Sequence, residues 1–223
     1  MLNWLFKKKY PKYWKKYLDH FTNGQPKSIN EIKFVVFDTE TTGLNITKDR
    51  VLSIGAISIM SNVIAVNDSF EIFIAQEHFN PETVEIHGLL KEGNIDKVSE
   101  KEALKQFLKY IKNAILVAHH IDFDISMINQ ILKRNNLPKL KNQLIDTGAL
   151  FKKTKKCDNA LKNYSLDHLA HVYDIEKHDR HTSQGDAYIT GLLFLKILAE
   201  LNERDHLTLS EILYSKLNTQ NYF

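Results

Sequence analysis

The sequence contains a single cysteine, Cys157, among its 223 residues. One cysteine cannot form a disulfide within the chain, and it cannot supply a zinc site built from several thiolates. The scarcity of cysteine excludes a secreted disulfide scaffold and points to a reducing compartment. We therefore expect a cytoplasmic location.

Long apolar runs are also missing. No stretch approaches the ~20 consecutive apolar residues of a membrane-spanning helix, so we expect no membrane insertion. The first six residues are too short for the apolar core of a signal peptide, and lysines follow them. A hydrophobic content of 43% suits a folded chain, and the length suits one domain with short extensions. We place the main domain at residues 31–203, after an N-terminal extension (1–30) and before a C-terminal helix and tail (204–223).

Acidic residues are absent from the first 17 positions, which carry six lysines. This segment has a charge of +6, whereas the rest of the chain has a charge of −3. Aromatic residues lie between the lysines, including both tryptophans, Trp4 and Trp14. Such a segment can pack its rings onto the domain as a helix, follow a nucleic-acid backbone, or bind an anionic membrane surface or a protein. We favour the packed helix.

The remaining pattern predicts a mixed α/β fold, because three strands precede alternating helices and strands. Ser99, followed by Glu102, and Ser165 are expected helix N-caps. The predicted strands cover residues 33–37, 51–60, 63–74, 113–118 and 143–146. The predicted helices cover residues 99–112, 122–135, 165–173, 183–201 and 209–217.

Four acidic residues fall where strands end and helices begin. Asp38 and Glu40 lie at the end of the first strand, Asp124 opens a helix, and Asp186 lies in the first turn of the longest helix. Carboxylates gathered at one sheet edge make an oxygen-rich site that suits Mg²⁺ or Mn²⁺. Two such ions can clamp the attacking and leaving oxygens of a phosphodiester. The alternative is that these residues only cap helices and strand ends.

Three local sequences resemble the motifs of the DnaQ-like (DEDDh) 3′–5′ exonucleases. Residues 34–44 (FVVFDTETTGL) resemble the first motif, nearest to the proofreading epsilon subunit of bacterial DNA polymerase III. Residues 117–124 (VAHHIDFD) resemble the second motif, and residues 181–187 (HTSQGDA) resemble the third in its histidine subtype. The resemblance covers about residues 32–201. It implies a ribonuclease-H-like mixed sheet, antiparallel in its first three strands, with later parallel strands and flanking helices.

Two positions depart from the second motif. The family usually has asparagine where this chain has His120, and Asp122 is an additional acid close to Asp124. We align Asp124 with the family's ligand because it follows Phe123. Without the family pattern, the sequence would also allow Asp122 as the ligand.

The resemblance implies roles for particular residues. His181 would be the general base, a role that suits an imidazole because its ordinary pKa is near 6.5. Two divalent ions, Mg²⁺ or Mn²⁺, would be held by Asp38, Glu40, Asp124 and Asp186, with Asp38 bridging them. The terminal nucleotide would contact Thr41, Leu44, Ile86 and His87. Core packing is the alternative role for Leu44 and Ile86.

The expected function is therefore metal-dependent 3′–5′ hydrolysis of DNA to nucleoside 5′-monophosphates, in proofreading or repair. The expected partners are single-stranded or frayed DNA 3′ ends and a DNA polymerase subunit. The first alternative is the same chemistry on RNA, because discrimination depends on contacts to the 2′-hydroxyl. The second is a non-catalytic, polymerase-binding subunit, against which the complete set of acids argues.

Overall fold

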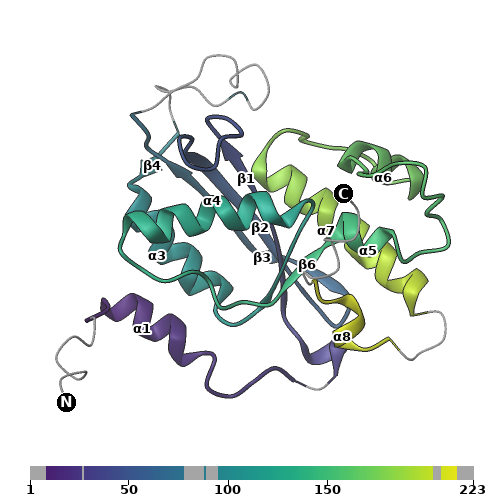
Figure 1. Cartoon of the computed structure of the whole chain (residues 1–223), viewed down its shortest axis with the longest axis horizontal. Coiled ribbons are helices and arrows are strands. Elements are labelled where there is room, and N and C mark those ends of the chain that lie inside the picture. The colour runs from purple at the N-terminus through teal and green to yellow at the C-terminus, as the bar shows by residue number, and fades with distance from the viewer. Residues whose placement is uncertain (1–8, 27, 78–87, 89–94, 203–206, 215–223) are drawn as a thin grey trace.

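One mixed sheet organises the residues that the computed structural model describes, which are 9–26, 28–77, 88, 95–202 and 207–214. Its six strands within those ranges have the order β4-β3-β2-β1-β5-β6 (Figure 1). β1 to β3 pair in antiparallel fashion, while β5 is parallel to β1, β6 to β5, and β4 to β3. The strands are β1 (Phe34–Thr41), β2 (Val51–Met60), β3 (Val63–Ile74), β4 (Lys97–Val98), β5 (Ile115–Ala118) and β6 (Leu144–Asp146).

The described helices cover both faces of this sheet. They are α1 (Lys12–Asp19), the short 3-10 helix η1 (Ile29–Glu31), α3 (Glu100–Ile111), α4 (Ile121–Arg134), α5 (Thr147–Phe151), α6 (Leu166–Val172), α7 (Ser183–Leu201) and α8 (Leu209–Ile212). In the described ranges, no helix combines the length and the apolar character that crossing a bilayer requires. The predicted mixed fold, antiparallel first and parallel later, is confirmed.

Several elements follow from local signals. β2, β3 and α7 have the predicted bounds. Ser61 and Asn62, between β2 and β3, have φ angles of 52° and 59°, as the tight two-residue turn of a hairpin requires. Ser99 and Ser165 accept hydrogen bonds from the third residue of α3 and of α6, as expected of N-caps.

Two predicted boundaries are wrong by more than three residues. β1 does not end before Asp38 but continues to Thr41, because β2 pairs with it along its whole length. α8 ends at Ile212 rather than near residue 217, because Leu213 is extended and the Tyr214 N–H donates to the Leu144 carbonyl of β6. Residues 215–217 of that prediction lie outside the described ranges.

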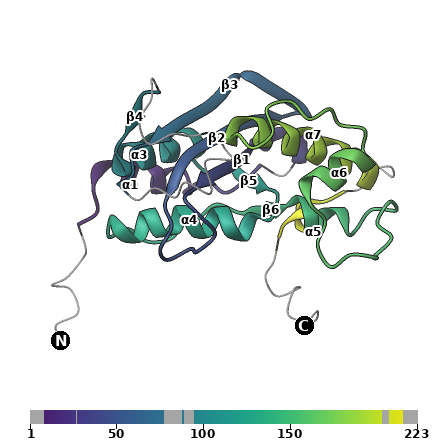
Figure 2. The same cartoon turned by 90° about the horizontal axis from the view of Figure 1, so that it is seen from above.

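The helices form two groups, one on each face of the sheet, and each group packs in its own hydrophobic layer. Val35 and Phe37 of β1 pack in a cluster with α1, α3 and α4. Phe34 and Val36 pack on the opposite face with α5, α6, α7 and α8. Figures 1 and 2 show the two groups on either side of the strands. Alternate residues of β1 therefore face different helices, which decides where its acidic side chains point.

The N-terminal helix α1 is part of the first layer. Trp14 and Tyr17 are buried in the same cluster as α3, beside which α1 lies (Figure 1). The Tyr17 hydroxyl donates to Asn142 and accepts from the Lys141 N–H. The lysines of α1, Lys12, Lys15 and Lys16, are exposed. This arrangement agrees with the packed helix favoured from the sequence, while a role of the lysines in nucleic-acid binding stays a prediction.

Replacement of Trp14 by alanine is expected to lower the free energy of unfolding by about 3–5 kcal/mol, because it empties a fully buried aromatic site. Trp14→Phe should cost much less: the indole N–H is buried without a described hydrogen-bond partner, so its removal loses no bond. Urea unfolding measures both, with Lys15→Ala as the exposed control on α1. Equal stability of Trp14→Ala and Lys15→Ala would contradict the packing role.

Candidate active site

β1 extends beyond its parallel neighbour and leaves an open edge. Its last partner in β5 is Val117, opposite Val36. The Thr39 N–H, further along, donates instead to Oδ1 of Asp124 at 3.0 Å, and the Thr39 hydroxyl donates to the same oxygen at 2.6 Å. α4 follows β5 almost directly, so its first turn places buried Asp124 beside this edge.

Asp38 and Glu40 lie two residues apart on the face of β1 that also carries Phe34 and Val36. That face is covered by α7. Asp38 pairs with Gly55 of β2, so the space above Asp38 is bounded by a residue without a side chain.

The first turn of α7 enters that space. A Cβ on Gly55 would lie 2.2 Å from the Ser183 carbonyl carbon and 2.3 Å from the Gln184 nitrogen. The Ser53 hydroxyl donates to the Ser183 hydroxyl at 2.9 Å, and Thr182 caps the helix through the Gly185 N–H. These contacts hold the N-terminus of α7, and hence Asp186, against β2.

The result is a cluster of three carboxylates. One oxygen each from Asp38, Glu40 and Asp186 lie within 4.8 Å of one another. Asp124 is not in that set, and its Oδ1 is held by Thr39. Asp186 Oδ1 is buried and accepts no hydrogen bond from a described residue. A buried anionic oxygen without a donor suits a bound cation.

The charges in this cluster oppose one another. Burial, followed by the charges of Asp124, Glu40 and Asp186, raises the pKa of Asp38 well above its usual range. Burial and the charge of Asp186 raise the pKa of Glu40 to about 7. Burial raises the pKa of Asp124 to about 7 against the lowering effect of its Thr39 bonds. A divalent cation would relieve this repulsion.

One arginine already faces the cluster. Arg180, in the segment before α7, donates to Asp186 and also to Asp167 of α6. Its positive charge lowers the pKa of Asp38 and of Glu40 against the larger effects that raise them. Arg180 was not predicted from the sequence.

His181 is not brought into the carboxylate cluster. Its side chain is exposed, its φ is 63°, and it forms no hydrogen bond with another side chain in the described part of the chain. Its neighbour Arg180 reaches Asp186 instead.

The residues expected at the terminal nucleotide are only partly described. Leu44 is 84% exposed on the loop after β1, which rules out core packing for it. Thr41 is buried, and its hydroxyl donates to the Gly43 carbonyl. The predicted contacts Ile86 and His87 lie outside the described residues.

The residues of the second motif have different surroundings. Asp122 accepts a hydrogen bond from Tyr214, whereas the charge of Asp124 acts on Asp38. His120 has a φ of 61°. Asparagine and histidine are both enriched in this left-handed conformation, so the backbone explains why histidine can stand where the family usually has asparagine.

The preceding residue of that motif, His119, is a partly buried structural residue. Its Nδ1 bonds to the Thr147 hydroxyl and its Nε2 to the Tyr164 carbonyl. Burial, followed by the charge of His120, lowers the pKa of His119 to about 4. The imidazole is therefore neutral near pH 7.

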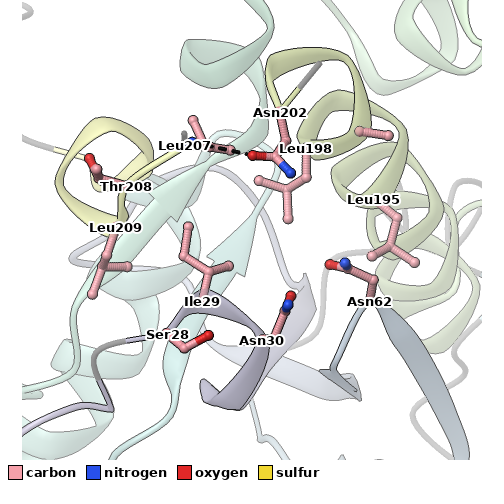
Figure 3. Close-up of a pocket in the computed structure, with 11 residues that line it drawn as sticks. Ser28, Ile29, Asn30, Asn62, Leu195, Leu198, Asn202, Leu207, Thr208 and Leu209 are labelled. Atoms are coloured by element: carbon pink, nitrogen blue, oxygen red, sulfur yellow. Dashed lines mark hydrogen bonds between the residues drawn. The ribbon is translucent and has the colours of Figure 1, made fainter. Parts of the chain in front are cut away.

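A separate hollow of about 660 Å³ lies at the other end of α7. Figure 3 shows leucine and asparagine side chains around it, including Leu195, Leu198 and Asn202. Among the described residues that line it, none is charged. It is about 14 Å or more along the helix from Asp186 at 1.5 Å per residue, so it is not part of the acidic site.

Comparison with known proteins agrees with this geometry. A family model described as Exonuclease (RNase_T) matches residues 35–194. The chain is 35% identical over 195 residues to DNA polymerase III PolC-type of Caldanaerobacter subterraneus subsp. tengcongensis, covering 85% of this chain but 13% of that protein. It is 30% identical over 169 residues to DNA polymerase III subunit epsilon of Aquifex aeolicus, covering 75% of this chain and 81% of that protein.

Solved structures share the fold. Exonuclease I of E. coli in complex with a dT13 oligonucleotide has a TM-score of 0.63 at 17% identity, covering 76% of this chain and 42% of that one. Exonuclease X in complex with 5′ overhanging duplex DNA has a TM-score of 0.61 at 20% identity, covering 80% and 96%. The resemblance of the three motifs is confirmed by the match over most of the chain, and the protein belongs to this exonuclease family.

Proposed function

We propose that this protein is a metal-dependent 3′–5′ exonuclease that hydrolyses DNA from its 3′ end to nucleoside 5′-monophosphates, in proofreading or repair. The observation that carries the proposal is the convergence of Asp38, Glu40 and Asp186 beside Asp124 in a member of the exonuclease family. The similarity to an epsilon subunit over most of its length supports DNA as substrate, as does the fold shared with exonucleases bound to DNA.

The site suits Mg²⁺ or Mn²⁺. Its donors are carboxylate oxygens, which these hard ions prefer, and Asp186 Oδ1 is a buried acceptor that lacks a described donor. Asp38, Glu40, Asp124 and Asp186 would hold two ions. Bound there, the ions would activate a water molecule and neutralise the charge on the leaving 3′ oxygen.

The protein's own groups would divide the remaining work. Asp38 and Glu40 project from a strand paired with β2, so their positions are fixed before substrate binds. His181 would accept the proton of the attacking water, for which its side chain must turn from solvent toward the carboxylates. Leu44, exposed beside the end of β1, would pack against the terminal nucleotide, together with Thr41, Ile86 and His87.

A single assay tests the function. The protein is incubated with 5′-labelled single-stranded DNA, duplex DNA with a mismatched 3′ end, and RNA, each with Mg²⁺, Mn²⁺ or a chelator. We expect stepwise shortening of DNA from the 3′ end, and none with chelator. Preferential degradation of RNA would support the ribonuclease alternative, and no cleavage of any substrate would favour the polymerase-binding alternative.

Replacement of His181 by alanine is expected to lower the rate constant kcat by about 10²–10⁴-fold, the usual contribution of a general base, without loss of folding, since the side chain is exposed. Single-turnover digestion of the labelled strand measures this step. His178→Ala, which removes another exposed histidine of the same segment, is the control. Wild-type kcat in His181→Ala would refute the general-base role.

Association with a DNA polymerase is also a proposal. The chain spans only 13% of the first PolC-type relative, and the epsilon relative is named as a polymerase subunit. A cytoplasmic location likewise stays a prediction.

A further inference from the structure

The Arg180 guanidinium lies between carboxylates that belong to two helices. Its Nη1 donates to Oδ2 of Asp186 in the first turn of α7. Its Nη2 and Nε donate to Asp167, in the first turn of α6, at 2.8 and 3.2 Å. The side chains of Arg180 and Asp186 are only 19% and 11% exposed, so solvent and salt screen this ion pair less than a surface pair.

The two oxygens of Asp186 have different surroundings. Oδ2 accepts from Arg180, whereas Oδ1 is buried without a described donor. Asp186 is also one of the three residues whose ligand oxygens gather within 4.8 Å. A metal-binding carboxylate whose other oxygen is held by a hydrogen bond has a fixed orientation, and such outer partners affect metal affinity.

We propose that Arg180 is a positioning residue for the metal site: anchored by Asp167, it fixes the carboxylate of Asp186 through Oδ2 and leaves Oδ1 to bind a divalent ion. This inference rests on the proposed function, because it assigns a task at the same site.

An arginine suits this task better than a lysine would. The planar guanidinium presents donors in several directions at once, so it can bridge two carboxylates, whereas an ammonium is a compact point charge. Asp167 is itself held a second time, by Lys177 at 2.7 Å. The bridge therefore ties the segment that contains Lys177 and Arg180 to α6 and to α7.

The bridge also reaches the neighbouring backbone. Asp179 and His181, on either side of Arg180, have φ angles of 53° and 63°, and the Asp179 carbonyl lies 2.1 Å from where a Cβ on Gly185 would be. The segment thus turns sharply and lies directly on α7. Fixing Arg180 fixes the backbone from which His181 projects.

The test is direct Mn²⁺ binding, measured by calorimetry without nucleic acid. Arg180→Gln is expected to weaken Mn²⁺ affinity by about 10–100-fold, and Arg180→Lys to stay impaired. Arg134→Gln is the matched control, since it breaks an arginine–carboxylate pair with Glu100 of comparable exposure, 27% and 18%. We expect the control to lose stability but to keep wild-type Mn²⁺ affinity.

A second variant separates the bridge from a local effect. Asp167 forms hydrogen bonds with Arg180 and Lys177, and it is not in the carboxylate cluster. Asp167→Asn should weaken Mn²⁺ binding in the wild-type background but add little in the Arg180→Gln background, because coupled residues are not additive. This variant also decides the question if Arg180→Gln does not fold.

Wild-type Mn²⁺ affinity in folded Arg180→Gln would overturn the proposal. Tighter Mn²⁺ binding would overturn it too, because it would show that the guanidinium competes with the ion. Additive effects of the two substitutions would overturn the bridge. Asp38→Asn distinguishes this failure from failure of the proposed function: if Asp38→Asn keeps wild-type Mn²⁺ affinity, the metal site itself is wrong.

Discussion

Replacing Asp38 with asparagine is expected to abolish measurable exonuclease activity, with a loss of more than about 100-fold. Substitution of residues that only support metal ligands costs about 10–100-fold, and Asp38 is at the centre of the ligand set. It lies in the carboxylate cluster, and the charges of Asp124, Glu40 and Asp186 all act on it. Digestion of a labelled DNA strand with Mg²⁺ measures the loss.

The same substitution should stabilise the protein in the absence of divalent ions. A carboxyl group whose pKa is raised on folding contributes stability only while protonated, so stability falls as pH rises through the unfolded and folded pKa values. For Glu40 this window extends from about pH 4.5 to about pH 7. Above the window, the raised pKa corresponds to a loss of about 3 kcal/mol in the free energy of unfolding. Removing the neighbouring charge of Asp38 relieves part of that cost.

Thermal melts at pH 8 test this reasoning. Mg²⁺ should raise the melting temperature of the wild type, whereas Asp38→Asn should melt higher than the wild type without Mg²⁺ and gain little from it. Asp19→Asn, on exposed α1 surface, is the control and should behave as wild type in both assays. Undiminished digestion by Asp38→Asn would refute the assignment of this residue.

Substituting alanine for Gly55 is expected to eliminate activity although Gly55 carries no chemistry. The added Cβ would lie 2.2–2.4 Å from backbone atoms of Ser183 and Gln184. Backbone at a helix start cannot rotate away as a side-chain end can, so α7 must move. Asp186 would then separate from Asp38, and overpacking would cost about 3 kcal/mol of stability.

Gly191→Ala provides a matched control at the same interface of α7 with β2. There the new Cβ would meet the Cδ1 atom of Ile57 at 2.6 Å, the far end of a side chain that can change rotamer. Alanine also favours helix over glycine by about 1 kcal/mol. Mn²⁺ affinity and DNA digestion should persist in Gly191→Ala and fail in Gly55→Ala. Retention of both by Gly55→Ala would show that α7 is not held as described.

The elements that could be predicted from the sequence are those with local signals. β2 and β3 are runs of β-favouring residues joined by a two-residue turn at Ser61 and Asn62, and Ser99 marks the start of α3. α5, with only five residues, escaped prediction although Asp146 caps it, because a single turn of helix is stable only through its packing. The true end of β1 also escaped prediction, because pairing with β2, and not local preference, carries the strand through Asp38 to Thr41.

Some residues of the candidate site could likewise be predicted from the sequence and others could not. The acids could be identified because the motifs around Asp38, Asp124 and Asp186 are contiguous in sequence. The bridge through Arg180 could not, because its partner Asp167 is 13 residues away and meets it only once α6 and α7 are packed. Gly55 did carry a signal, since glycine inside a strand often marks a close backbone approach.

The packing of α1 has a consequence for the order of folding during synthesis. Tyr17 bonds to Asn142, 125 residues later in the chain. At a translation rate of about 5–20 residues per second, roughly 6–25 s separate the synthesis of the two residues. For much of that interval Trp14 and its neighbouring rings cannot pack against α3, which shares their cluster and begins at Glu100, 86 residues after Trp14. α1, the first of the described helices in chain order, is therefore buried late, and the nascent chain exposes an aromatic, lysine-rich segment before its fold is complete.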